Sequence, residues 1–162
     1  MRVTKRTNIA MRVLMFCAAH PDRLVTKSEI ARVCNASENH LAQVINQLGQ
    51  LGYLTTRRGR NGGLELGRAP ADIVIGDVFR AIEAPMPLAE CFADVDSTCP
   101  LVDACRLRVA LTGAAEAFYA ALDPITLDSL MCGNHALMSI LAPGDCSASG
   151  RATALESREA LV

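Results

Sequence analysis

Residues 26–66 carry the pattern that most narrows what this chain of 162 residues can fold into. Thr26 and Glu29 have the spacing of a capping box, which predicts that a short helix begins there. Asn35 then interrupts the helical pattern, and Ser37 is suited to cap a second helix whose apolar residues recur at helical spacing. Two short helices joined by a tight turn are a helix-turn-helix.

A basic, glycine-rich segment follows the second helix directly. Residues 53–56 and 64–66 are typical of two short strands, and three arginines lie between them. The pair Asn61-Gly62 favours a tight hairpin turn with positive φ. A helix-turn-helix followed at once by a basic hairpin predicts a winged helix. The expected fold class is therefore mainly α, with a small β-hairpin wing.

Helical periodicity predicts four further helices, over residues 7–20, 73–83, 101–122 and 126–131. The helix that begins at Leu101 is apolar on nearly every side, because Glu116 is its only charged residue from Val109 onward. A helix of that kind must be buried on more than one face. A chain of this length cannot bury it alone, so we expect a long dimerisation helix in a two-fold homodimer.

The charges divide the chain into a basic and an acidic part. Residues 1–70 contain 11 Lys or Arg and 4 Asp or Glu, a net charge of +7, whereas residues 71–162 have a net charge of −8. Only the first part is suited to a polyanion. We expect a winged helix-turn-helix domain over residues 1–68. A cysteine loop with the dimerisation helix follows over 69–142, and a flexible tail over 143–162.

The exposed face of the second short helix and the hairpin carry side chains suited to DNA. Asn and Gln amides pair with adenine edges, Glu accepts from cytosine, and arginines contact phosphates or the minor groove. The residues expected to contact DNA are Thr26, Lys27, Ser37, Glu38, Asn39, His40, Gln43, Arg57, Arg58, Arg60 and Asn61. Lys5 and Arg6 are further candidates for phosphate contacts. Taken singly, each side chain is better explained as solvated surface, but their common context favours double-stranded DNA as the partner.

Cys91, Cys99 and Cys105 are clustered with the spacing Cys-x7-Cys-x5-Cys in an acidic loop flanked by prolines. Structural zinc sites favour closer pairs, whereas longer gaps allow a loop to wrap around an iron–sulfur cluster held by thiolates. Three cysteines leave one iron position to another group, which suits the sensing of small molecules. Redox-active thiols, zinc with an external ligand and cysteines packed as core hydrophobes are the alternatives. We rank the cluster first, redox-active thiols second and zinc third, and the acidic, proline-flanked loop argues against core packing.

Enzymatic activity is not expected. The sequence shows no nucleophile paired with a base, no histidine-rich metal site and no phosphate-binding glycine loop between a strand and a helix. No segment approaches the roughly 20 apolar residues that span a membrane, and the apolar run from Val13 to Ala19 is a poor signal peptide. We therefore expect a cytoplasmic protein with reduced thiols.

These features together resemble one known family, the Rrf-type winged-helix transcriptional regulators. The resemblance covers about residues 1–142. It rests on Thr4-Lys5-Arg6-Thr7-Asn8, on Asn39-His40-Leu41 with Val44-Ile45-Asn46-Gln47-Leu48, on Arg58-Gly59-Arg60-Asn61-Gly62-Gly63, and on Cys91, Cys99-Pro100 and Cys105-Arg106-Leu107. It implies a homodimer that binds palindromic operators and holds an iron–sulfur cluster in each cysteine loop, with 4Fe–4S favoured over 2Fe–2S. It also implies that damage to the cluster loosens DNA binding.

Two branches of this family share features with the chain. Asn39-His40-Leu41 and Cys105-Arg106-Leu107 resemble the NsrR type, repressors whose cluster is attacked by nitric oxide. Asn8 and the segment from Cys99 to Cys105 are more similar to the RirA type, which reports iron supply. We expect a repressor that senses nitric oxide, and an iron-responsive regulator of iron metabolism genes is the alternative.

Asn8 occupies the position at which NsrR-like chains have an aspartate that completes the cluster of the other subunit. A neutral amide oxygen is a poorer iron ligand than a carboxylate. The candidates for the fourth ligand are therefore Asn8, water, a small thiol and another side chain such as Cys34.

Overall fold

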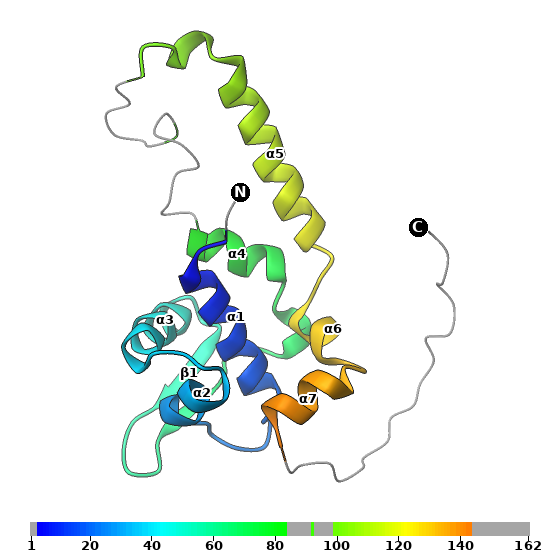
Figure 1. Ribbon diagram of the computed structural model, residues 1–162. Helices are drawn as coiled ribbons and strands as arrows, with labels where there is room; N and C mark the ends of the chain where they lie inside the picture. The colour runs from blue at the N-terminus through cyan, green and yellow to red at the C-terminus, as the bar shows by residue number, and fades with distance from the viewer. Residues whose placement is uncertain (1–2, 84–91, 93–98, 144–162) are drawn as a thin grey trace.

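The structure is a computed structural model that describes residues 3–83, 92 and 99–143. It is mainly helical with one antiparallel hairpin, which confirms the predicted fold class (Figure 1). Its elements are α1 (Lys5–Ala18), α2 (Lys27–Val33), α3 (Glu38–Gln50), β1 (Leu54–Arg57), β2 (Gly63–Leu66), α4 (Ile75–Glu83), α5 (Arg106–Leu122), α6 (Leu127–Met131) and α7 (His135–Leu141). Short 3-10 turns precede α4 and α5. Across the described residues, no helix combines the length and apolar character that crossing a membrane requires.

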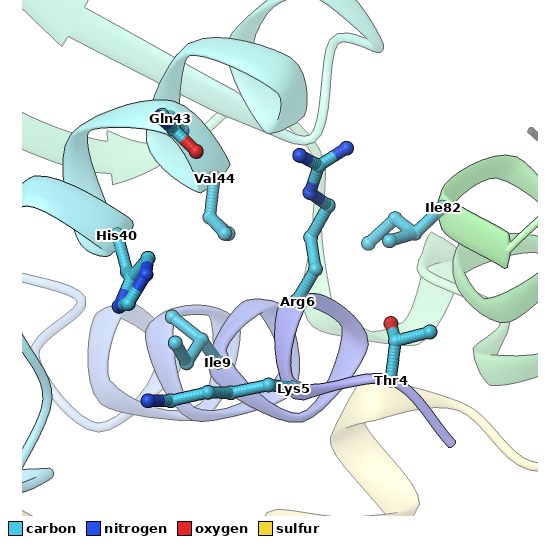
Figure 2. A pocket seen from close by; sticks show the side chains of 8 residues that line it. All are labelled: Thr4, Lys5, Arg6, Ile9, His40, Gln43, Val44 and Ile82. Carbon is cyan, nitrogen blue, oxygen red and sulfur yellow. The ribbon is translucent and has the colours of Figure 1, made fainter. Parts of the chain in front are cut away.

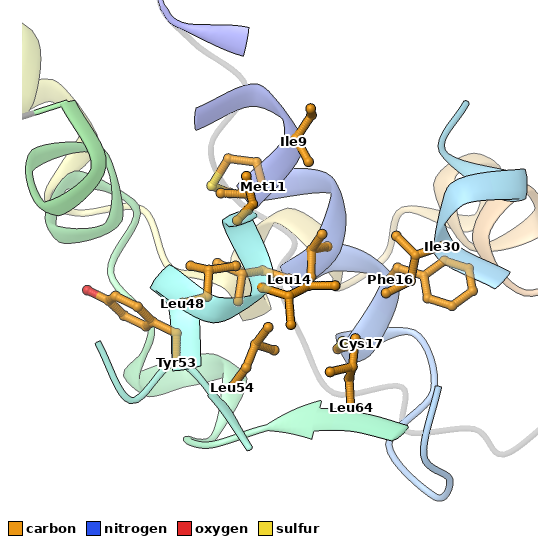
Figure 3. Close-up of a cluster of buried hydrophobic side chains, with 14 of the residues drawn as sticks. Ile9, Met11, Leu14, Phe16, Cys17, Ile30, Leu48, Tyr53, Leu54 and Leu64 are labelled. Carbon is orange, nitrogen blue, oxygen red and sulfur yellow. The ribbon is translucent and has the colours of Figure 1, made fainter. Parts of the chain in front are cut away.

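The core lies around α1, which contacts α3, α4, α6 and β2 (Figure 3). Leu14 and Phe16 of α1 are fully buried, and Leu41 and Leu48 of α3 pack into the same cluster. Burial of one such side chain contributes roughly 1.5–3 kcal/mol to folding. Leu127 of α6 belongs to this cluster as well, so residues far along the chain help to hold the helix-turn-helix.

The predicted capping box is confirmed at the start of α2. The Thr26 hydroxyl accepts from the backbone N–H of Glu29 at 3.2 Å, and the Glu29 carboxylate accepts from the backbone N–H of Thr26 at 2.7 Å. Asn35 has a φ of 47°, a left-handed conformation that breaks the chain between α2 and α3. Ser37 occupies the N-cap of α3 as predicted, without a side-chain hydrogen bond to the helix.

The wing differs from the sequence prediction at its turn. β1 and β2 pair antiparallel with Arg57 opposite Gly63, so the loop spans residues 58–62 and is too long for a tight turn at Asn61-Gly62. The positive φ lies instead at Gly59, whose carbonyl accepts from the Gly62 N–H at 3.0 Å. Gly62 is required by space, because a Cβ there would overlap the Arg57 carbonyl oxygen.

α4 connects the helix-turn-helix to α5. Arg80 of α4 donates two hydrogen bonds to the Asp123 carboxylate at the end of α5, at 2.5 and 2.9 Å. The rings of Phe79 and Phe118 meet with their centroids 6.0 Å apart. These contacts hold the C-terminal half of α5 against the body of the protein.

Several helix boundaries differ from the sequence predictions, and one helix was not predicted. α1 begins at Lys5 because the Thr4 hydroxyl caps it by accepting from the Thr7 N–H. The long helix begins at Arg106 because Cys105 is extended, with a φ of −79° and a ψ of 102°. The helix α7 was not predicted. Its cap is the Asn134 side chain, which accepts from the Leu137 N–H at 3.1 Å.

α5 extends away from the rest of the protein as a long arm (Figure 1). None of its residues is buried in the single chain. Leu107 and Val109 are 64% and 73% exposed, which is unusual for large apolar side chains. A helix with this composition therefore lacks, within one chain, the burial that its sequence demands.

Candidate functional site

The exposed face of α3 carries the side chains predicted to read DNA. Glu38, Asn39, His40 and Gln43 are all exposed, as is Ser37 at the N-cap. The opposite face of α3 is buried against α1, which holds the helix firmly against the core. Polar amide, carboxylate and imidazole groups are thus presented on one edge, at the end of the helix that usually meets base pairs.

An ion pair joins two of the residues predicted to contact DNA. The Lys27 Nζ atom lies 3.1 Å from Glu38 Oε2, and the Ser28 hydroxyl donates to Glu38 Oε1 at 3.3 Å. The hydrogen bond and the charge of Lys27 lower the pKa of the Glu38 carboxyl. The charge of Lys27 is therefore partly neutralised by Glu38.

Thr26 was predicted to contact DNA, but in the structure its side chain caps α2. Its hydroxyl accepts from the Glu29 N–H and donates to the Glu29 carboxylate at 2.8 Å. Hydrogen bonds from Thr26 and Arg23 outweigh the effect of partial burial and lower the pKa of Glu29. The Thr26 side chain is thus committed to the cap of α2, and contact with DNA stays a prediction.

The wing presents Arg58, Arg60 and Asn61 on its exposed loop. Arg57 lies at the end of β1 and pairs with Glu65 across the hairpin, with Arg57 Nη2 3.0 Å from Glu65 Oε1. Among the described residues, neither Arg58 nor Arg60 has an ion-pair partner. These two guanidinium groups are therefore the free cations of the wing, whereas the charge of Arg57 is partly neutralised.

Two of the three clustered cysteines lie in the described part of the chain. Cys99 and Cys105 are half-buried, and Cys105 occupies the N-cap of α5. Cys105 also lines a hollow of about 550 Å³, together with Phe92, Asp103, Arg106 and Arg108. Cys105 supplies a soft thiol at the positive end of a helix dipole, which suits an anionic iron–sulfur cluster. The chemistry of this end of α5 therefore fits such a cluster.

Cys91 lies outside the described residues. Within the described ranges, no three His, Cys, Asp or Glu side chains are gathered as a metal site. Asn8 is exposed on α1, and it does not line the hollow that Cys105 lines. The assignment of Cys91, Cys99, Cys105 and Asn8 as ligands stays a prediction.

The other described cysteines have different surroundings. Cys17 is buried in the core, and burial raises the pKa of its thiol to about 12. Burial also raises the pKa of Cys34, whose thiol donates weakly to the Arg12 carbonyl at 4.0 Å. Cys132, after α6, is exposed. Buried thiols with raised pKa values are poor metal ligands at neutral pH, which disfavours Cys34 as the fourth ligand.

A contact that the sequence did not reveal joins α4 to the start of α1. The Glu83 carboxylate accepts from the Thr4 N–H and the Thr4 hydroxyl, both at 2.9 Å, and from the Thr7 hydroxyl. Glu83 is the last residue of α4, and the segment with the cysteines follows it in sequence. No local pattern predicts a contact between residues so far apart along the chain.

A family model described as "Rrf2: Iron-dependent Transcriptional regulator" matches residues 3–133. The chain belongs to the Rrf2 family. The Rrf2 regulators bind DNA and control transcription, which confirms the prediction that this protein is not an enzyme. The match includes the winged helix, the cysteine segment and α5, so the proposed sites all lie within the family region.

Curated relatives in the Rrf2 family include two proteins named NsrR. The HTH-type transcriptional regulator NsrR of Geobacillus kaustophilus (strain HTA426) is 44% identical over 142 residues, covering 87% of this chain and 97% of that protein. The NsrR of Bacillus subtilis (strain 168) is 41% identical with the same coverage. Protein aau3 of Rhizobium meliloti (strain 1021) is 43% identical over 131 residues, covering 81% and 85%. These relatives confirm the resemblance to the NsrR type.

Solved structures of Rrf2 proteins confirm the winged-helix fold. T. potens IscR aligns with a TM-score of 0.62 and 23% identity, covering 81% of this chain and 86% of that chain. The B. subtilis cysteine regulator CymR (YrzC) aligns with a TM-score of 0.61 and 23% identity, covering 81% and 96%. At this identity the likeness concerns the fold.

Proposed function

We propose that this Rrf2 protein is a homodimeric transcriptional repressor that senses nitric oxide through an iron–sulfur cluster. The observation that carries the proposal is the 44% identity to an NsrR over 97% of that protein's length. The cysteine spacing and the position of Cys105 at the start of α5 support it. The exposed polar face of α3 and the free arginines of the wing support binding to a palindromic operator.

Cys91, Cys99 and Cys105 would hold the cluster, with 4Fe–4S favoured over 2Fe–2S. When bound, such a cluster supplies an iron that is not held by a thiolate and is open to nitric oxide. The protein contributes the thiolates, the positive end of α5 and the hollow lined by Phe92 and Arg108. Asn8 of the second subunit is the proposed protein candidate for the remaining iron position.

Dimerisation through α5 is proposed from its exposure. The helix is long and largely apolar, yet none of its residues is buried in one chain. A second copy that packs along it would cover Leu107 and Val109 and orient two winged helices for a two-fold operator. The proposed dimer would therefore bury the apolar residues of α5, and it would provide the two-fold symmetry that binding to palindromic DNA requires.

An iron-responsive regulator of the RirA type is the alternative, because Asn8 and the Cys99-to-Cys105 segment resemble that branch. Anaerobic purification followed by titration with nitric oxide, and separately by iron chelation, distinguishes the two. Absorbance and anisotropy of a labelled operator duplex are the measurements. We expect nitric oxide to bleach the cluster and release DNA at near-stoichiometric ratios. Release by chelation alone would favour the iron-responsive alternative, and a protein without cluster absorbance would contradict both.

The wing provides a second prediction. Arg58→Gln and Arg60→Gln should weaken binding to all duplexes and lower the slope of log affinity against log salt by about 0.9 for each phosphate that is no longer neutralised. Arg57→Gln should have a smaller effect because Arg57 is already paired with Glu65. Fluorescence anisotropy over a range of salt concentrations measures the slope. An unchanged slope in both variants would show that the wing does not contact DNA.

A further inference from the structure

A hollow of about 370 Å³ lies where the start of α1, the exposed edge of α3 and the end of α4 meet. Its floor is apolar and is formed by Ile9, Val44 and Ile82. Lys5 and Arg6 of α1 line it together with His40 and Gln43 of α3. Figure 2 shows the Arg6 guanidinium reaching past Val44, while the Lys5 side chain runs beside Ile9 on the side of His40.

The two cations of this hollow are unpaired within the described residues. Lys27 and Arg57 each have a carboxylate partner, at 3.1 and 3.0 Å, but neither Lys5 nor Arg6 has an ion pair or a side-chain hydrogen bond there. The first turn of α1 contains no acidic residue. The Glu83 carboxylate already binds the capped start of α1, so Lys5 and Arg6, and not the helix end, supply the positive charge of the hollow. The hollow is therefore suited to an anion.

The position of the hollow identifies the kind of anion. His40 and Gln43 belong to the exposed face of α3 that is predicted to read the edges of DNA bases, and they form one wall of the hollow. In Figure 1 the start of α1 and the loop of the wing lie far apart, on either side of α3. An anion held at the hollow would thus lie on the groove edge away from the wing, where the DNA backbone runs.

The start of α1 is held rigidly enough to act as a binding element. Thr4 caps the helix, and the Glu83 carboxylate of α4 binds the Thr4 N–H and the Thr4 and Thr7 hydroxyls. In Figure 2 the aliphatic part of Lys5 runs beside Ile9 and that of Arg6 passes Val44, and both residues are exposed. Less side-chain freedom is then lost on binding.

We infer that Lys5 and Arg6 bind phosphates of the DNA backbone and so form a second anchor across α3 from the wing. This inference rests on the proposed mode of DNA binding and adds a site to it. Phosphate contacts fix the register of a protein on the duplex, and the anchor would therefore orient α3 between two backbone contacts. Because it reads no base edge, it should contribute equally to all sequences.

The test uses the full-length protein and a random-sequence duplex, with affinity measured by anisotropy at several salt concentrations. Lys5→Gln and Arg6→Gln should each weaken binding and lower the salt slope by about 0.9 for each phosphate that the variant no longer neutralises. The matched controls Lys5→Arg and Arg6→Lys keep the charge at the same positions and should keep the slope. Thermal unfolding of each variant verifies that the fold is retained.

The outcomes separate this inference from the proposed DNA-binding mode. If the wild type and its wing variants behave as predicted but Lys5→Gln and Arg6→Gln keep the wild-type slope, the anchor is wrong and the winged-helix mode stands. If the wild type binds no duplex, both are wrong. A decrease in affinity in Lys5→Arg equal to that in Lys5→Gln would indicate packing instead of phosphate contact and would also overturn the anchor. Saturable binding of inorganic phosphate that Arg6→Gln abolishes, with no effect of this variant on the salt slope, would overturn it by assigning the hollow to a free anion.

Discussion

Replacing Cys99 or Cys105 by Ala is expected to abolish both the absorbance of the iron–sulfur cluster and the release of DNA by nitric oxide. Each change removes one of only three proposed thiolate ligands, and a cluster left with two thiolates should be lost during purification. Iron and acid-labile sulfide should fall to background in the purified variants. Operator binding should become insensitive to nitric oxide, as measured by anisotropy before and after titration. Cys91→Ala should have the same effect.

Cys132→Ala is the matched control for these variants. Cys132 is exposed and lies after α6, outside the proposed cluster site, so its removal changes the number of thiols without changing the ligand set. It should keep the iron content and the response of the wild type. If all three proposed ligand variants keep their cluster and their response, the sensor is not this cysteine group. Loss of response in Cys132→Ala without loss of iron would favour thiol oxidation as the signal.

Val109→Glu on α5 is expected to convert the dimer into a monomer and to weaken operator binding by about 100-fold or more, since two linked sites bind far more tightly than one. Val109 is 73% exposed in the single chain, so the substitution costs little in the monomer. A dimer would bury the new carboxylate in an apolar seam, at a cost of several kcal/mol for each charge. Light scattering coupled to size exclusion measures the mass, and anisotropy measures the affinity.

Ile140→Glu is the corresponding control because Ile140 on α7 is similarly exposed, at 62%, but lies outside α5. It should remain dimeric with wild-type affinity. A Val109→Glu protein that is still a dimer would exclude this part of α5 from the interface. A wild-type protein that is monomeric at all concentrations tested would contradict the proposed homodimer itself.

The helix-turn-helix was predictable because its signals are local. The box formed by Thr26 and Glu29, the break at Asn35 and the cap at Ser37 each depend on residues within one or two turns. The apolar spacing of α3 selects its buried face by the geometry of the helix alone. The fold class and the candidate reading face therefore followed from the sequence.

The errors arose where the outcome depends on distant pairing or on weak caps. The strand register sets the length of the wing loop. The residue with positive φ is therefore Gly59, whereas the prediction placed a tight turn at Asn61-Gly62. Because Cys105 is extended, α5 begins at Arg106 and not at Leu101 as predicted. The cap formed by the Asn134 side chain allows α7, which was not predicted. Such features depend on contacts that a scan of local periodicity does not include.

The candidate site likewise combines features that local sequence predicts with features that depend on distant contacts. Sequence spacing identified the three cysteines and the basic wing, because ligand type and charge are properties of the residues themselves. The structure showed that Lys27 is held by Glu38, that Arg57 is held by Glu65, and that Lys5 and Arg6 share a hollow with α3. Whether a surface cation is free for DNA depends on which carboxylate the fold places beside it.

By itself the sequence determined the winged helix, the charge that suits DNA, the spacing of the three cysteines and the family resemblance, since these rest on short-range pattern and side-chain chemistry. Only the tertiary structure decided which of the described cations are unpaired, how α4 ties α1 to α5, and that α5 has no buried residue in one chain. Those properties arise from packing between segments far apart in sequence, and each such contact depends on how the whole chain is folded.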